Sequence, residues 1–363
     1  MRPILAIDEN EKIPLPKKFH AINDLCAVIY DQLTEIYKLS NYKPLLKTAL
    51  SSEDSKKFIE DQKENPIHIL DWLKEHALDE ELEIMLTKHL TLSIVSDLIN
   101  FIFESMYCAK RGKMTVAYAL IRKPFTDELL ILEQLLVNRE EFVKKFFHIG
   151  NPDEYDPSSQ KIDKMAIITA AVEKIRTNHL YSAEIIYKSR YDKTFEAGLN
   201  GISNQALHIV TRDKSYKTLE QNLNFVFSQK DDFNRYYENY YYIVPQLLIY
   251  TVSVIDGIIF NILTDKDNQA LKTVKEFRRI IAYLFFTEYS KISPKRRNDK
   301  LFDRLSNLLD LTCSKCQYKN KLNRADFKLF LDAELFICSK CFNNLLDSLE
   351  SVQTIDNLLS KEE

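Results

Sequence analysis

The chain has 363 residues, of which 45% are hydrophobic and 28% charged, and its formal net charge is −3. These values are typical of a globular protein, and they exclude a disordered chain or one with an overall attraction to nucleic acid. Glycine is scarce, with 5 residues in the whole chain. Nucleotide-binding loops need glycine clusters and tight β-turns need single glycines, so this scarcity excludes the former and favours long helices.

Apolar residues recur at helical spacing through most of the chain. They predict a helix over about residues 19–36, a long helix over 80–110, and a helical stretch over 117–147 that bends at Pro124. Further helices are predicted over residues 161–200, 219–227 and 269–290. The sequence therefore predicts a mainly α fold with a multi-helix body over residues 1–292, with a sub-boundary near 150–160.

The longest apolar run, residues 243–263, is long enough to cross a bilayer. Gln246 and Asp256 lie inside it, and a central aspartate costs about 2.5–3.5 kcal/mol on insertion scales. We therefore expect a buried core helix and no membrane contact. The tyrosine-dense residues 236–242 could stack nucleic-acid bases, but helical spacing favours core or subunit packing.

Residues 80–150 carry small side chains followed by Ile121, Arg122, Glu128 and Glu133, a pattern that resembles the HEPN-type helical proteins of bacteria. The resemblance implies descent from ribonucleases and a role in bacterial stress response or antiviral defence against phage. HEPN ribonucleases place a histidine four to six residues after an arginine. This sequence lacks that pair, which puts ribonuclease activity in doubt.

Three residues are candidates for a catalytic site. His208 lies one helical turn after Asn204 and is the best-placed histidine for proton transfer. Arg122 could clamp a substrate, or it could form a buried ion pair with Asp127 or Glu128. A degenerate HEPN-like ribonuclease site near Arg122, Asn204 and His208 is therefore the alternative function, and a structural role for each is the simpler interpretation.

The clearest motif lies near the C-terminus, where two CxxC pairs are separated by 21 residues. Two residues between thiolates let one tight turn aim both sulfur atoms at a single ion, and two such turns complete a tetrahedron. A redox dithiol pair and plain buried cysteines are the alternatives. The spacing predicts one structural Zn²⁺ bound by four ligands, Cys313, Cys316, Cys338 and Cys341.

Residues 300–363 are predicted to form this zinc-binding module. Between the cysteine pairs, residues 327–331 and 335–337 have the composition of two short strands, so we expect a β-hairpin there, with a terminal helix after Cys341. The order of cysteine turn, hairpin, cysteine turn and helix resembles the zinc-ribbon and treble-clef modules. Residues 293–299 are interpreted as a basic linker before it.

The module is locally basic, which suits phosphate contact as well as simple solvation; its cations are Lys315, Lys319, Lys321, Arg324, Lys328 and Lys340. A closed shell of four cysteines leaves no open position for catalysis. We therefore predict a non-catalytic binding or assembly protein that docks a protein or nucleic-acid partner or associates with itself. Metal-binding cysteines and the lack of a signal-peptide pattern favour the reducing cytoplasm.

Overall fold

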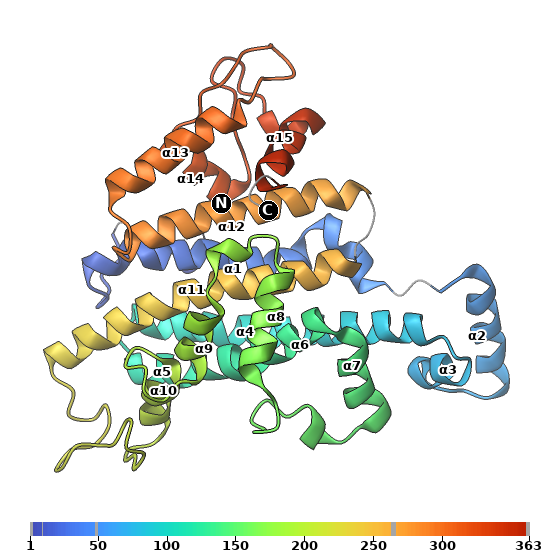
Figure 1. The fold of residues 1–363 in the computed structure, drawn as a ribbon, viewed down its shortest axis with the longest axis horizontal. Coiled ribbons are helices and arrows are strands. Elements are labelled where there is room, and N and C mark those ends of the chain that lie inside the picture. The colour runs from blue at the N-terminus through green and yellow to red at the C-terminus, as the bar shows by residue number, and fades with distance from the viewer. Residues whose placement is uncertain (1–2, 9, 48–49, 263–265, 361–363) are drawn as a thin grey trace.

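The protein is described by a computed structural model that covers residues 3–8, 10–47, 50–262 and 266–360. The described residues form fifteen α-helices and no β-strand, so the predicted mainly α fold is confirmed. Glycine scarcity was the correct indicator, because helices need few tight turns. The helices named below are shown in Figure 1.

Three long helices form the centre of the molecule: α1 (His20–Lys38), α11 (Lys230–Ile262) and α12 (Lys266–Tyr289). Each packs against the other two, and their facing side chains form a large part of the main hydrophobic core. In Figure 1 they lie across the middle of the molecule, and both the lower and the upper helices pack on them.

The lower layer is built on α4, the predicted long helix, which runs from Asp79 to Lys110. α5 packs along α4 and continues through a π-helical turn (Pro124–Glu128) into α6. Proline has no backbone N–H, so it interrupts the regular α-helical hydrogen bonding here. The interruption lies at the position where the sequence predicts a bend. The helices that complete this side are α5 (Met114–Lys123), α6 (Leu129–Val137), α7 (Arg139–Val143), α8 (Lys164–Lys174), α9 (Ala183–Tyr191) and α10 (Leu199–Leu207).

A small lobe at one end of α4 contains α2 (Ser52–Glu64) and α3 (Ile69–Glu75). Its apolar side chains form a second cluster around Trp72, separate from the main core. The lobe lies at the side of the molecule in Figure 1 and packs on the N-terminal part of α4. The long helix α4 therefore contributes to both clusters.

Helix α11 contains the tyrosine-dense stretch and residues 243–262 of the apolar run in one continuous element; residue 263 lies outside the described part of the chain. Four of the five clustered tyrosines are buried, and Tyr242 is partly exposed. The Tyr240 hydroxyl lies 2.8 Å from the Ser105 hydroxyl, and the Tyr241 hydroxyl donates to Asn23 at 3.0 Å. The packing interpretation of these tyrosines is confirmed. By length and composition alone, α4 and α11 could each cross a membrane; the most apolar window of α11 is 89% buried inside the protein and that of α4 39%.

The β-hairpin predicted between the cysteine pairs is wrong. Residues 327–331 lie in α14 (Arg324–Ala333). Asn323 begins this helix with a capping box, in which the Asp326 carboxylate accepts from the Asn323 N–H at 2.7 Å. The residues expected to alternate along a strand lie instead on one buried helical face: Phe327, Phe330 and Leu331.

Two smaller expectations are also wrong. Residues 293–299 are no linker, because α13 begins at Lys295 and extends to Leu309. Residues 219–227 form turns rather than a helix. α13 and the terminal helix α15 (Leu349–Ser360) pack together and, with α14, lie against α12. Side chains from all three join the main core, and the predicted division between residues 292 and 300 stays a prediction.

Candidate functional site

The first cysteine pair lies on a tight loop, the first knuckle (residues 311–320). The Cys313 N–H donates to the Tyr318 carbonyl at 2.9 Å, and the Gln317 N–H donates to the Cys313 carbonyl at 2.9 Å. An isolated antiparallel bridge joins Thr312 to Lys319 at the base of the loop. These bonds fold the chain back on itself and point both cysteines toward the same place.

The second pair repeats this geometry on the second knuckle (residues 336–345). The Cys338 N–H donates to the Asn343 carbonyl, and the Phe342 N–H donates to the Cys338 carbonyl, both at 2.9 Å. A bridge joins Ile337 to Asn344 at the base. In both knuckles the residue after the second cysteine has a left-handed backbone, with φ of 57° at Gln317 and 60° at Phe342. A left-handed φ normally favours glycine, so Gln317 and Phe342 adopt a backbone conformation that is unfavourable for their side chains.

The two knuckles bring all four cysteine sulfur atoms within 4.8 Å of one another. Cys313 Sγ lies 3.5 Å from Cys341 Sγ, and Cys316 Sγ lies 3.7 Å from Cys338 Sγ. A tetrahedral ion with metal–sulfur bonds of about 2.3 Å requires sulfur atoms about 3.8 Å apart. The four cysteines could therefore bind one metal ion without rearrangement of the backbone.

The surroundings favour the thiolate, the form that binds metal, at Cys338 and oppose it at Cys316. Burial opposes ionisation of Cys338, but the N–H groups of Cys341 and Lys340 and the Asn320 amide, 3.6 Å away, bring its pKa down to about 6. Burial and neighbouring sulfur atoms raise the pKa of Cys316 to about 12. Crowded thiols of this kind ionise together only when a cation neutralises them, so the cluster is suited to a bound cation.

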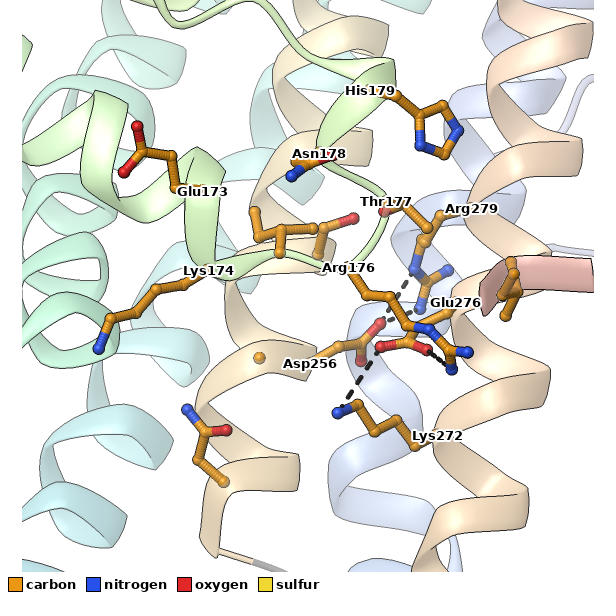
Figure 2. A pocket seen from close by; sticks show the side chains of 15 residues that line it. Glu173, Lys174, Arg176, Thr177, Asn178, His179, Asp256, Lys272, Glu276 and Arg279 are labelled. Atoms are coloured by element: carbon orange, nitrogen blue, oxygen red, sulfur yellow. Dashed lines mark hydrogen bonds and ion pairs between the residues drawn. The ribbon is translucent and has the colours of Figure 1, made fainter. Parts of the chain in front are cut away.

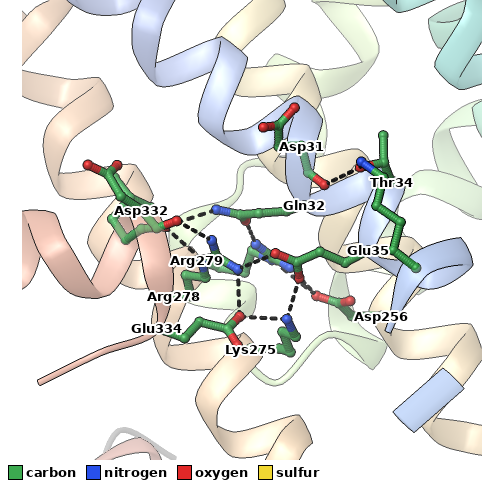
Figure 3. Close-up of polar contacts among 12 residues, drawn as sticks. Asp31, Gln32, Thr34, Glu35, Asp256, Lys275, Arg278, Arg279, Asp332 and Glu334 are labelled. Atoms are coloured by element: carbon green, nitrogen blue, oxygen red, sulfur yellow. Dashed lines mark hydrogen bonds and ion pairs between the residues drawn. The ribbon is translucent and has the colours of Figure 1, made fainter. Parts of the chain in front are cut away.

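A cluster of charged side chains, which we call the clasp, joins α14 to the central helices (Figure 3). Lys275 and Arg278 of α12 are buried, and each contacts both Glu35 of α1 and Glu334 at the end of α14. Arg278 also donates to the Leu331 carbonyl at 2.7 Å. Although burial opposes its ionisation, Glu35 has a lowered pKa because Arg278 and Lys275 adjoin it. The clasp thus fixes the last turn of α14 to α1 and α12.

The same hydrogen-bond network continues into the protein through Gln32 of α1. Its amide donates to the Leu331 carbonyl at 3.4 Å, and its carbonyl accepts from Arg279. Arg279 in turn donates to the Asp256 carboxylate at 2.8 and 3.0 Å. A continuous chain of polar contacts therefore runs from α14, which lies between the knuckles in sequence, to Asp256 in the C-terminal part of α11 (Figure 3).

Asp256 and Arg279 also line a cavity of about 560 Å³ between residues 173–179 and helices α11, α12 and α15 (Figure 2). Arg176 lies 3.3 Å from Glu276 in its wall and 2.7 Å from Asp356 of α15. Both arginines are already bound to carboxylates, so the wall is polar but electrically balanced. Nothing in this arrangement selects a cationic or an anionic ligand.

The three candidates for acid–base chemistry lie on helices that touch. Arg122 is in the last turn of α5, Asn204 is in α10, and His208 ends α10 as an exposed residue. α5 and α10 pack together. Among the described residues no carboxylate lies within 4 Å of Arg122; Glu128 is 3.1 Å from Lys123 instead. The Asn204 amide donates to the Asn200 carbonyl at 2.7 Å.

Asp256, inside the apolar run, was a buried charge that the sequence indicated. Lys275, Arg278 and Arg279 are also buried, but they lie on an amphipathic helix, α12, where nothing in the sequence marks them as internal. Amphipathic patterns assign such residues to solvent, and only their partners on other helices show otherwise. Asn320, which orients the second knuckle by accepting from the Ser339 N–H at 2.9 Å, gave no signal of its own.

Comparison with known protein families, with curated proteins and with solved structures finds no match for this chain. Its function must therefore be inferred from its own residues and their geometry.

Proposed function

We propose that the chain is a non-catalytic binding or assembly protein whose C-terminal region is held together by one structural Zn²⁺. The observation that supports this most directly is the cluster of four cysteine sulfur atoms at tetrahedral spacing. Tetrahedral sulfur ligation suits zinc or iron, and zinc is the redox-inert choice for a structural site. Four protein ligands close the shell, so the metal has no position for a substrate or a catalytic water.

In this proposal the metal ion stabilises the surface that surrounds it. Each knuckle joins the main core through buried residues, such as Leu311 in the first and Phe336 in the second, and the ion would hold the two loops to each other. The clasp then fixes the metal-bound region to α1 and α12. This arrangement supports a rigid docking surface for a protein or nucleic-acid partner. The thiols of all six cysteines are free, which is consistent with a reducing compartment such as the cytoplasm.

Metal analysis tests the proposal. Reduced, purified protein should contain one zinc per chain by elemental analysis, and a Cys313→Ser/Cys338→Ser variant should contain none. Cys108→Ala is the matched control, because Cys108 lies in α4 outside the cluster, and it should retain full zinc. Metal-free reduced protein would overturn the proposal, and stoichiometric iron would overturn the assignment of zinc.

The packing of α5 on α10 favours a second candidate, a HEPN-like ribonuclease with a degenerate site. Under this proposal His208 transfers a proton at the ribose hydroxyl while Arg122 and Asn204 position the RNA. Labelled RNA should then be cleaved by the protein and by a His89→Ala variant, whose histidine is exposed on α4. Cleavage should be lost in His208→Ala. Intact RNA, or equal cleavage by both variants, would remove this candidate.

A further inference from the structure

The charge of the protein is unevenly distributed along the chain. Residues 291–346, which include α13, α14 and both knuckles, carry twelve Lys and Arg against six Asp and Glu, a formal charge of +6. The whole chain is −3, so the remainder is −9. A local basic region on an acidic protein is the electrostatic signature of a specific anionic partner.

Ion pairing within the protein leaves this excess positive charge exposed. Five of the six carboxylates in residues 291–346 are bound: for example Asp299 pairs with Arg324, and Glu334 belongs to the clasp. Nine of the twelve cations have no ion-pair partner among the described residues. They are exposed and comprise Lys291, Lys295, Arg296, Arg297, Lys300, Arg304, Lys315, Lys321 and Lys340.

Two aromatic side chains are exposed beside the metal cluster. Phe342 is 79% exposed and directly follows Cys341; Tyr318 is 44% exposed and lies two residues after Cys316. Phe342 also has a left-handed backbone, with φ of 60°. It therefore occupies a position that suits glycine while gaining little from burial. Neither packing nor backbone preference explains a phenylalanine there.

The cations and the aromatic rings belong to one continuous part of the structure. α13 rises from the end of α12 toward the loops that hold the knuckles (Figure 1). Its 15 residues span about 22 Å, which is several nucleotides of an extended strand. Basic residues occupy this helix from its first turn, and Lys315 and Lys340 continue the positive charge onto the two knuckles.

We propose that α13 and the two knuckles bind single-stranded nucleic acid. The inference rests on the proposed zinc-held module. The nine cations contact phosphates, while Phe342 and Tyr318 stack on bases. A single strand is favoured over a duplex because stacking on a side chain needs an unpaired base face. The alternative occupant is the acidic body of a second copy of this chain. It would supply negative charge for the cations but no nucleobase on which the exposed rings could stack.

Binding is tested with the full-length, zinc-loaded protein and end-labelled oligo(U), oligo(dT) and duplex DNA of about 20 nucleotides. Fluorescence anisotropy should show tighter binding to both single strands than to the duplex. The two single-stranded arms separate RNA from DNA. Affinity should fall linearly on a log–log plot as salt rises from about 50 to about 200 mM.

Charge variants test the surface. Lys315→Gln/Lys340→Gln should make the salt slope shallower by about 1.4, because each phosphate contact on a single strand contributes about 0.7. The matched control is Lys56→Gln/Lys57→Gln, which removes two exposed lysines of α2 and should bind as the original protein does. Equal loss in the two pairs of variants would overturn the assignment of the surface.

Phe342→Gly separates binding from folding. Glycine suits the left-handed backbone, so zinc content and thermal stability should be kept or raised while binding weakens by about five- to a hundredfold. Phe227→Ala, which removes a ring that is 63% exposed outside the module, should bind normally. Unchanged binding by Phe342→Gly at full zinc content would overturn the stacking role.

Two further outcomes would overturn the proposal as a whole. One is the absence of binding to either single strand at about 50 mM salt. The other is dimerisation in light scattering that Arg296→Gln/Arg297→Gln abolishes, which would identify a second copy as the occupant. Zinc is measured in every sample, so loss of metal, which bears on the proposed function, is distinguished from loss of nucleic-acid binding at full zinc.

Discussion

Glu128 is a carboxylic acid in an environment that opposes its ionisation. It lies in the π-helical turn after α5 and is 94% buried, since 6% of its surface is exposed. Burial, together with a hydrogen bond shared with Asp97, raises its pKa to about 8 in spite of the nearby Lys123. The folded protein therefore holds a proton on Glu128 at a pH where the unfolded chain has lost it.

This shift predicts a pH dependence of stability. Between about pH 4.5 and 8 the folded state binds the extra proton, so the free energy of unfolding should fall as pH rises through that window. Glutamine has the shape of protonated glutamate and does not ionise. The Glu128→Gln variant should therefore be more stable than the original protein at pH 8 by on the order of 4 kcal/mol, and about equally stable at pH 4.5. Urea denaturation at both pH values measures the difference; a constant difference would contradict the assignment.

Arg190 and Glu133 form an ion pair with no exposure of either side chain. Tyr250 also donates to Glu133 at 2.9 Å, and Arg190 donates to the Phe125 carbonyl at 2.5 Å. The pair links α9 to α6 and α11 through the core. Removing one partner would leave the other charge buried without a counter-ion, which costs much more free energy than the intact pair contributes.

Glu133→Gln should therefore lower the free energy of unfolding by about 3–5 kcal/mol, because Arg190 remains charged and buried. Glu184→Gln is the matched control. It removes the 63% exposed partner of Lys188, also on α9, and should change stability by less than about 0.5 kcal/mol. Urea denaturation at neutral pH compares the two, and equal effects would show that the buried pair is energetically unimportant.

At the scale of single elements, the sequence was most informative where one pattern extends over many residues. The apolar stripe over 80–110 and the run over 243–263 correctly indicated α4 and the buried part of α11. The cysteine spacing correctly indicated a four-sulfur cluster. These features depend on local periodicity or on loop geometry, which a sequence records directly.

Short segments between the cysteines were less predictable. Residues 327–331 are apolar and aromatic, as in a strand, and their helical state depends on burial against α12 and α13. The capping box of Asn323 and Asp326 was the local signal for a helix, and it is only four residues long. The clasp could not be foreseen, because its members come from α1, α12 and α14.

The capping box also gives a prediction for α14. Asn323→Ala removes the N-cap and should lower the free energy of unfolding by about 1 kcal/mol. Since α14 connects the knuckles, the variant should also lose zinc faster to a chelator. Asn307→Ala, an exposed change inside α13, should keep both properties. Identical rates of zinc loss in the two variants would show that the cap does not support the metal site.

At the scale of the whole molecule, the two hydrophobic clusters differ in their links to the four cysteines. The main core includes Cys313, Cys338 and side chains from α11 and α12, so the cysteine cluster and the central helices belong to one packed unit. The lobe around Trp72 has its own cluster, which touches the rest mainly through α4 and α7. A small cluster with few apolar contacts can open locally at a lower free energy than the main core.

Trp72, the one tryptophan of the chain, reports on this lobe. It is 1% exposed, and its ring N–H donates to Asp61 at 2.8 Å. We expect tryptophan fluorescence to change at a lower urea concentration than far-ultraviolet circular dichroism, which follows all the helices. Adding a chelator should lower the midpoint of the circular-dichroism transition and leave the fluorescence midpoint in place. Superimposable curves that shift together would instead show that α4, which runs through both clusters, transmits the loss of metal to the whole protein.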